Sequence, residues 1–180
     1  MNFSYPLPFL PERSQCTRQG TKPITRVKMA EESFSVQLQR EAQPIWDAIF
    51  CHPFLQAIQA GTLPLAQFRS YLCQDYRYLE GFARAVALAL AKAPDPYSLR
   101  LLSQRVIRPV ERSLHTHLFD LLELSVDQAE EIPPAPTNLA YINHMLASAA
   151  LGSVGEAAAA LLPCPWTYHE LGNYLPLAPS

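Results

Sequence analysis

Glycine is scarce in this 180-residue sequence, and so are the loops that depend on it. Only 6 glycines are present, and they form neither a glycine-rich phosphate loop nor a G-x-S-x-G nucleophile turn. The strict alternation of apolar and polar residues that is typical of β-strands is also missing. These absences exclude the common nucleotide-binding and serine-hydrolase motifs, and they favour a protein built from helices.

An excess of positive charge is absent as well. The 14 Lys and Arg residues are balanced by 16 Asp and Glu residues, which gives a formal net charge of −2. Proteins that bind nucleic acid or anionic membranes carry a basic surface, so we expect no partner of either kind. Arg84 and Glu156 interrupt the apolar runs before they reach the roughly 18 residues of a transmembrane helix. We therefore expect a soluble protein.

Cysteine motifs and metal-binding motifs are also lacking. The four cysteines form no C-x-x-C pair, and their spacing fits neither a zinc site nor a disulfide framework. We therefore expect a cytoplasmic protein with reduced thiols. Glu111 and His115 are four residues apart, but the second Glu-x-x-His pair of a di-iron bundle is missing. We expect no metal and no cofactor, and His115 is interpreted as part of a surface pair or of a hydrogen bond between helices.

The first 28 residues differ from the rest of the chain. They contain four prolines, five basic residues and one acid, without helical periodicity. We expect residues 1–28 to be a disordered or mis-assigned N-terminal extension, with the true start at Met29. A transit peptide and a functional arm are the alternatives. Residues 29–180 are expected to form one helical domain.

Apolar residues recur at helical spacing from Phe34 onward, and prolines and glycines divide the pattern into segments. The predicted helices cover residues 34–49, 54–61, 64–92, 96–124 and 138–151, with a short helical turn after residue 125 and an Ala-rich helix from residue 154. A kink is expected at Pro109, and the Ala-rich helix is expected to carry Pro163 and Pro165 in its interior. The fold class is therefore all-α, a bundle of long helices.

Four of these helices begin with residues that commonly cap helix N-termini. Asp95 precedes Pro96, and Thr137 follows a proline-rich break, so each is a candidate N-cap. Ser125 and Ser153 are each followed three residues later by Gln or Glu, which predicts capping boxes.

The most informative segment surrounds Cys164. Pro163 and Pro165 flank this cysteine, and a proline inside a helix costs about 3 kcal/mol. Broken helical turns are frequent at functional sites, and Tyr168, four residues later, lies on the same helix face. Two interpretations stay open: a nucleophilic thiol beside a positioned ring, or a buried cysteine in a kinked core helix.

A second pattern places one acid among aromatic rings. Tyr71, Asp75, Tyr78 and Phe82 are spaced by 4, 3 and 4 residues and therefore share one helix face. A buried acid is rare unless a partner or a ligand binds it. Asp75 is therefore either a ligand-binding group or a residue that faces water beside ordinary core aromatics.

Taken together, the motifs of this sequence resemble the TenA (thiaminase II) family in order and in spacing, over about residues 40–172. The residues that carry the resemblance are His52-Pro53-Phe54, Gly61-Thr62-Leu63-Pro64, Phe68, Tyr71-Leu72, Gln74-Asp75, Tyr78-Leu79, Phe82, Pro136-Thr137, Tyr141, Leu161-Leu162-Pro163-Cys164, Trp166, Tyr168 and Glu170. The resemblance implies a haem-oxygenase-like helical bundle of the TenA/PqqC type. It also implies small pyrimidine and thiamine derivatives as ligands, and assembly into a homo-oligomer.

The resemblance further implies an aminopyrimidine hydrolase of thiamine salvage. Its substrate would be 4-amino-5-aminomethyl-2-methylpyrimidine, which becomes the hydroxymethylpyrimidine. Cys164 is similar to the family's nucleophile, which adds to the pyrimidine ring, and Tyr78 to the phenol that helps activate it. Asp75 is similar to the residue that hydrogen-bonds the ring nitrogen and the exocyclic amine. Tyr141 and Tyr168 are similar to the pocket walls.

The chain departs from the family pattern after the cysteine helix. Members of the family continue with at least two more helices, which carry a further tyrosine and the glutamate that acts as acid and base. We expect the domain to be incomplete at its C-terminus, without these two helices, and no residue of the sequence matches that glutamate. The alternatives to a hydrolase are a truncated, inactive copy, a bundle that binds pyrimidines without turnover, and an enzyme completed by a second polypeptide.

Overall fold

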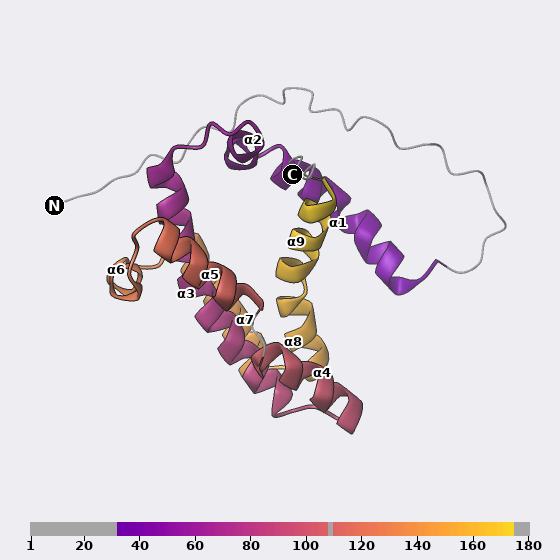
Figure 1. Ribbon diagram of the computed structural model, residues 1–180. Coiled ribbons are helices and arrows are strands. Elements are labelled where there is room, and N and C mark those ends of the chain that lie inside the picture. Colours follow the sequence, from indigo (N-terminus) through magenta and orange to yellow (C-terminus); the bar gives the residue numbers. More distant parts are fainter. Residues whose placement is uncertain (1–31, 108–109, 175–180) are drawn as a thin grey trace. The chain divides into compact units, whose positions relative to one another are not determined.

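The computed structural model describes residues 32–107 and 110–174, and every regular element in these stretches is an α-helix (Figure 1). The helices are α1 (Phe34–Phe50), α2 (Pro53–Gln59), α3 (Leu65–Leu90), α4 (Pro96–Ile107), α5 (Val110–Leu121), α6 (Val126–Glu131), α7 (Pro136–Leu151), α8 (Val154–Leu161) and α9 (Pro163–Tyr174). The prediction of an all-α fold is confirmed. None of these helices is both long enough and apolar enough to cross a lipid bilayer.

The chain divides into two compact units, Met1–Gln56 and Ala57–Ser180. The first unit contains α1, and the second contains all helices from α3 to α9. The boundary that the sequence predicts at Met29 lies outside the described residues and stays a prediction.

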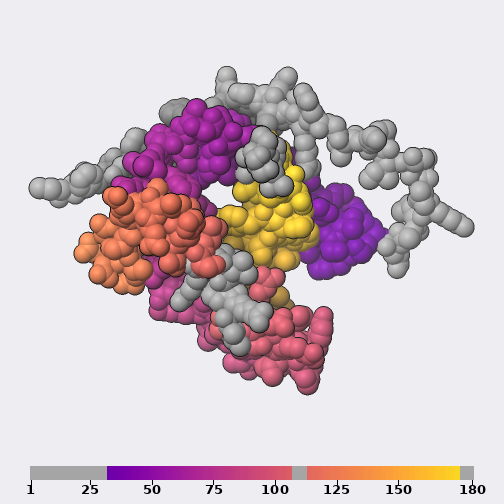
Figure 2. Space-filling model, viewed as in Figure 1, coloured from indigo at the N-terminus to yellow at the C-terminus, as the bar shows by residue number. Residues whose placement is uncertain are grey.

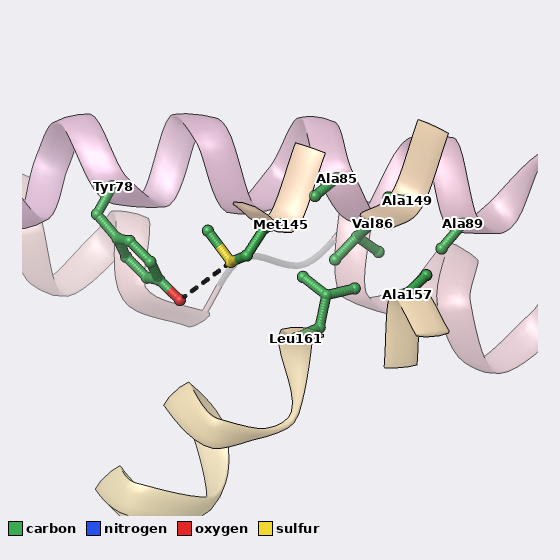
Figure 3. Packing of buried hydrophobic residues seen from close by; sticks show 8 residues of the cluster. All are labelled: Tyr78, Ala85, Val86, Ala89, Met145, Ala149, Ala157 and Leu161. Atoms are coloured by element: carbon green, nitrogen blue, oxygen red, sulfur yellow. Dashed lines mark hydrogen bonds between the residues drawn. The ribbon is translucent and has the colours of Figure 1, made fainter. Parts of the chain in front are cut away.

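Helix α3 is the centre of the second unit, because α4, α6, α7 and α8 all pack against it. Figure 3 shows the main core cluster between α3, α7 and α8. Its buried members are Tyr78, Ala85, Val86, Ala89, Met145, Ala149, Ala157 and Leu161. Alanine is abundant in this set, and its small side chain lets the helices lie close together.

The contacts fix the directions of α7 and α8 relative to α3. Gln74 accepts a hydrogen bond from Asn138 near the start of α7, and Lys92 donates one to the Ala150 carbonyl near its end. Helices α3 and α7 therefore run in the same direction. Helix α8 runs in the opposite direction. Ala157, early in α8, lies near Ala89 at the C-terminal end of α3 (Figure 3), whereas Cys164, just after α8, lies beside Tyr78 nearer the middle of α3.

Close approach of α3 and α7 depends on Gly81. A Cβ atom at this position would lie 2.7 Å from Cγ2 of Ile142, well inside the distance at which carbon atoms pack. The absence of a side chain at Gly81 therefore sets the separation of the two helices next to Tyr78.

A second buried cluster lies on another side of α3 and consists of Leu72, Cys73, Phe119 and Ala129. These residues come from α3, α5 and α6. In the space-filling view, the orange atoms of α6 lie beside α3 (Figure 2). Asp75 is three residues after Leu72 and therefore on the same side of α3, where its carboxylate is hydrogen-bonded to His115 of α5.

Three of the four predicted helix starts are confirmed. Ser125 and Ser153 both form complete capping boxes, and Asp95 accepts hydrogen bonds from the backbone N–H groups of Tyr97 and Ser98, both at 2.8 Å. The prediction for Thr137 is wrong, because Ala135 is the N-cap of α7 and Pro136 occupies its first turn. Proline tolerates that position since its missing N–H needs no partner there.

The Ala-rich segment forms two helices rather than one. We expected Pro163 and Pro165 inside a single helix, but α8 ends at Leu161 and α9 begins at Pro163. Both prolines thus lie in the first turn of α9, where their lost hydrogen bonds cost little. The kink expected at Pro109 lies outside the described residues, which leave out 108–109 between α4 and α5.

Candidate active site

The five residues predicted for the site lie on three helices of the second unit. Helix α3 carries Asp75 and Tyr78, α7 carries Tyr141, and α9 carries Cys164 and Tyr168. The structure brings them together: Cys164 lies with Tyr78 and Tyr141, and Asp75 lies with Tyr168. Tyr168 also interacts with Cys164, so the two groups form one cluster.

The break between α8 and α9 places Cys164 in the first turn of α9. Its side chain is partly buried and packs against the main core cluster. From this position the thiol reaches Tyr78 on α3 and Tyr141 on α7. The local sequence therefore puts a thiol at a suitable position for a nucleophile.

Tyr78 and Tyr141 form one wall beside this thiol. Their rings stack with centroids 5.5 Å apart and an interplanar angle of 24°. The Tyr78 hydroxyl donates a hydrogen bond to the Met145 sulfur at 3.6 Å (Figure 3). The Tyr141 hydroxyl donates to the Ala160 carbonyl at 3.3 Å, at the end of α8.

Burial keeps these phenols protonated. Desolvation raises the pKa of Tyr78 far above its ordinary value, and the hydrogen bond and charge of Cys164 raise it further. Burial also raises the pKa of Tyr141, although hydrogen bonds from Tyr78 and from the Cys164 backbone N–H oppose that shift. At neutral pH both residues are therefore hydrogen-bond donors, and neither can act as a base.

A pair of hydroxyl groups joins α3 to α9 on the other side of the site. The Tyr71 and Tyr168 hydroxyls are hydrogen-bonded to each other. Burial raises the pKa of Tyr71 to about 12, and the Asp75 carboxylate adds to the shift. Tyr168 is 49% exposed as a whole residue, but local desolvation, followed by the Asp75 charge, raises its pKa. Tyr71 was not predicted to be a site residue, although its four-residue spacing from Asp75 placed it on the same face.

Asp75 is bound to a histidine on a neighbouring helix. Nε2 of His115, on α5, lies 2.8 Å from Oδ2 of Asp75, and the exposed fractions of the two side chains are 7% and 19%. Asp75 therefore points inward, and His115 makes the hydrogen bond between helices that was one of its two predicted interpretations. Nothing in the sequence identified Asp75 as its partner. The side chain of Glu111, which the sequence paired with His115, lies outside the described part of the chain.

The site contains no group of ligands for a metal. Among residues 32–107 and 110–174, no three His, Cys, Asp or Glu side chains lie close enough together to hold a metal ion. No disulfide involves Cys51, Cys73 or Cys164. The chemistry that this arrangement offers is that of one thiol, one carboxylate and several neutral phenols.

Comparisons with known sequences point to a single protein family. The profile of the TENA/THI-4/PQQC family matches residues 39–176. An aminopyrimidine aminohydrolase of Halalkalibacterium halodurans is 40% identical over 142 residues, which are 78% of this chain and 63% of that protein. The aminopyrimidine aminohydrolase of Bacillus subtilis is 37% identical and is covered to 61% of its length. The chain thus spans about three fifths of these two curated relatives.

Solved structures show the same similarity. A TenA homologue from P. horikoshii OT3 superposes with a TM-score of 0.71 at 37% identity, over 78% of this chain and 66% of that one. A protein described as a TenA family transcription regulator, from Silicibacter sp. TM1040, superposes with a TM-score of 0.72 at 33% identity, over 77% and 63% of the two chains.

Proposed function

This chain belongs to the TENA/THI-4/PQQC family, and from that premise we propose that it hydrolyses aminopyrimidines in thiamine salvage, in the cytoplasm. The proposed substrate is 4-amino-5-aminomethyl-2-methylpyrimidine, and the products are the hydroxymethylpyrimidine and ammonia. Relatives named aminopyrimidine aminohydrolase support this activity.

The observation that carries the proposal is the position of Cys164. This thiol lies at the α8–α9 break beside Tyr78 and Tyr141, and Tyr168 on the next turn of α9 interacts with the Asp75 carboxylate. One cluster therefore contains a nucleophile, aromatic walls, and a carboxylate that can bind the exocyclic amine and the adjacent ring nitrogen of an aminopyrimidine. A structural cysteine would need none of these neighbours.

The reaction that we propose proceeds by covalent addition to the ring. The Cys164 thiolate forms a C–S bond with a ring carbon, and a ring nitrogen takes up a proton, which makes the ring electron-rich. The electron pair then expels the protonated amine from the C5 methylene as ammonia. Water adds to that methylene and passes a proton to the released ammonia, the ring nitrogen loses its proton, and the C–S bond breaks to restore the thiolate.

Each neighbouring residue has a role that fits its protonation state. Asp75 accepts a hydrogen bond from the exocyclic amine, and it stabilises the proton that the ring nitrogen acquires by accepting from that N–H as well. Tyr78 is a neutral phenol next to the Cys164 sulfur, so it stabilises the thiolate when its hydroxyl turns from Met145 and donates to that sulfur, without removing the thiol's proton. Tyr141 and Tyr168 hold the ring between aromatic side chains.

Replacement of the nucleophile tests this proposal. We expect Cys164→Ser to abolish ammonia release from the aminomethylpyrimidine, whereas Cys51→Ser should leave it unchanged. Cys73 is unsuitable as a control, because it is buried in the second cluster and a hydroxyl there would destabilise the fold.

Two results would contradict the proposal. Undiminished turnover by the Cys164→Ser variant would remove the nucleophile. A wild-type chain that binds the aminopyrimidine but releases no ammonia would instead be a pyrimidine-binding bundle.

A further inference from the structure

We propose that His115 is a positioning residue of this site, which holds Asp75 as a fixed hydrogen-bond acceptor and so makes the site select ligands that present an N–H donor at the position this acceptor faces. This inference rests on the proposed function, because it concerns how the same site recognises its pyrimidine. His115 is not placed in contact with the ligand, and it acts through Asp75.

Burial and distance single out this pair. His115 is 6% exposed, and among the residues that the structure describes it is the one polar or charged residue classed as buried. Its Nε2 atom lies 2.8 Å from Asp75 Oδ2, within the range of a charge-assisted hydrogen bond. Its ring packs on Phe119 with centroids 6.0 Å apart, so an apolar neighbour and one carboxylate determine its orientation.

The second ring nitrogen indicates which tautomer is present. Nδ1 of His115 is buried and has no hydrogen-bond partner among the described side chains. A proton on Nδ1 would therefore be an orphaned buried donor, which is rarer and costlier than an unsatisfied acceptor. The arrangement with the lower cost is a neutral imidazole whose Nε2–H donates to the ionised Asp75 carboxylate.

This arrangement restricts what Asp75 can bind. Oδ2 uses one of its two lone pairs on the hydrogen bond from His115, so Oδ1 is the oxygen with both acceptor positions left for a ligand, and the ionised group cannot donate. An aminopyrimidine presents an exocyclic N–H to such an oxygen. A 4-oxopyrimidine has a carbonyl oxygen at that position and carries its N–H on the neighbouring ring nitrogen, so an acceptor held in one place cannot meet both compounds in the same pose. Sites that hydrogen-bond a particular group discriminate strongly against analogues that lack it.

A pair of substitutions separates positioning from mere packing. His115→Gln keeps an N–H donor near the position of Nε2, and His115→Leu keeps the volume but removes the donor. His117 is exposed and lies two residues further along α5, so His117→Leu is the matched control. Circular dichroism would establish that each variant is folded.

Calorimetric titration would use the full chain with 4-amino-5-hydroxymethyl-2-methylpyrimidine and its 4-oxo counterpart. We expect His115→Leu to weaken binding of the amino compound about ten-fold, the size expected for a charge-assisted hydrogen bond, and to reduce discrimination against the oxo compound. His115→Gln should restore most of the affinity for the amino compound and most of the discrimination. His117→Leu should change neither the affinity nor the discrimination. Wild-type affinity and discrimination in His115→Leu, or no rescue by a folded His115→Gln, would overturn the inference.

Nitrogen-15 spectra of the histidine rings give a readout that needs no ligand and no turnover. We expect the His115 signal, assigned by its loss in His115→Gln, to be that of the neutral Nε2–H form, and we expect it to shift in Asp75→Asn. A doubly protonated or Nδ1-protonated ring would overturn the positioning role itself. A wild-type chain with the expected spectrum that binds neither pyrimidine would overturn the proposed function instead.

Discussion

At the scale of single residues, loss of contact with water, more than the nearby charges, raises the pKa values of the tyrosines of the site. Desolvation is the largest cause of the raised pKa at Tyr71, Tyr78 and Tyr168, and the neighbouring carboxylate or thiol only adds to it. The phenols therefore stay neutral well above neutral pH. They can solvate a thiolate without competing for its proton.

Alkaline unfolding should show this effect at Tyr71. Its pKa is about 12 in the folded chain, against an ordinary value of 10.0. As the pH rises, the unfolded state therefore loses this proton first. The contribution of the protonated Tyr71 phenol to the free energy of unfolding is complete below about pH 10 and is lost as the pH rises through about 12. We expect urea midpoints to fall over this range, and less steeply in Tyr71→Phe.

Tyr78 and Tyr168 also have raised pKa values, so the slope in Tyr71→Phe should be reduced rather than removed. Curves for wild type and Tyr71→Phe that run parallel between pH 10 and 12 would show that the Tyr71 phenol ionises equally in both states.

The site could be predicted only where it depends on local spacing. Asp75 and Tyr78 share a helix face because they are three residues apart, and the prolines next to Cys164 indicate a broken turn whatever the tertiary structure. His115 is 40 residues from Asp75, and no periodicity of the sequence connects them. Its role depends on how α5 packs against α3, which the sequence pattern does not specify.

At the scale of helices, the errors of prediction came from proline. Sequence patterns located the long helices closely, since apolar periodicity and Ser-based capping boxes are strong local signals. Thr137 was predicted as an N-cap because it follows a proline-rich break, but Pro136 can itself occupy the first turn. Pro163 was likewise expected inside a helix that in fact ends before it.

Gly81 gives a prediction for the α3–α7 contact. A Cβ atom there would lie 2.7 Å from a methyl group of the stiff, β-branched Ile142, so Gly81→Val should force the helices apart. We expect a loss of about 1–3 kcal/mol in the free energy of unfolding, measured by urea titration. The displaced Tyr78 should also lower hydrolysis.

Gly155→Ala is the matched control, because a Cβ there meets only the Ser153 Oγ at 3.7 Å. It should be neutral or stabilising, since alanine favours the helix. A Gly81→Val variant with unchanged stability would mean that α7 can shift without cost.

At the scale of the whole molecule, the second unit leaves several large apolar side chains in solvent. Four leucines of α4, α5 and α7 are more than half exposed: Leu99, Leu114, Leu121 and Leu151. We therefore expect the 180-residue chain to form homo-oligomers or larger species and to bind an apolar dye.

Sedimentation velocity and dye fluorescence would measure both effects. Replacing Leu121 and Leu151, which are 65% and 89% exposed, by Gln should reduce them without loss of helix content. A monomeric chain that binds no dye and melts sharply would contradict this expectation.

The hydrogen bond between Tyr71 and Tyr168 joins residues 97 positions apart. Because of this separation, the two halves of the site emerge from the ribosome at different times. The ribosome delivers the chain from its N-terminus, so α3 and α7 can begin to pack together before α9 has emerged. The nucleophile and Tyr168 arrive after these two helices, on a helix that attaches to a core already in place. A nascent chain should therefore have its α3–α7 core in place before it is reactive, because its thiol can enter the site only after that core has formed.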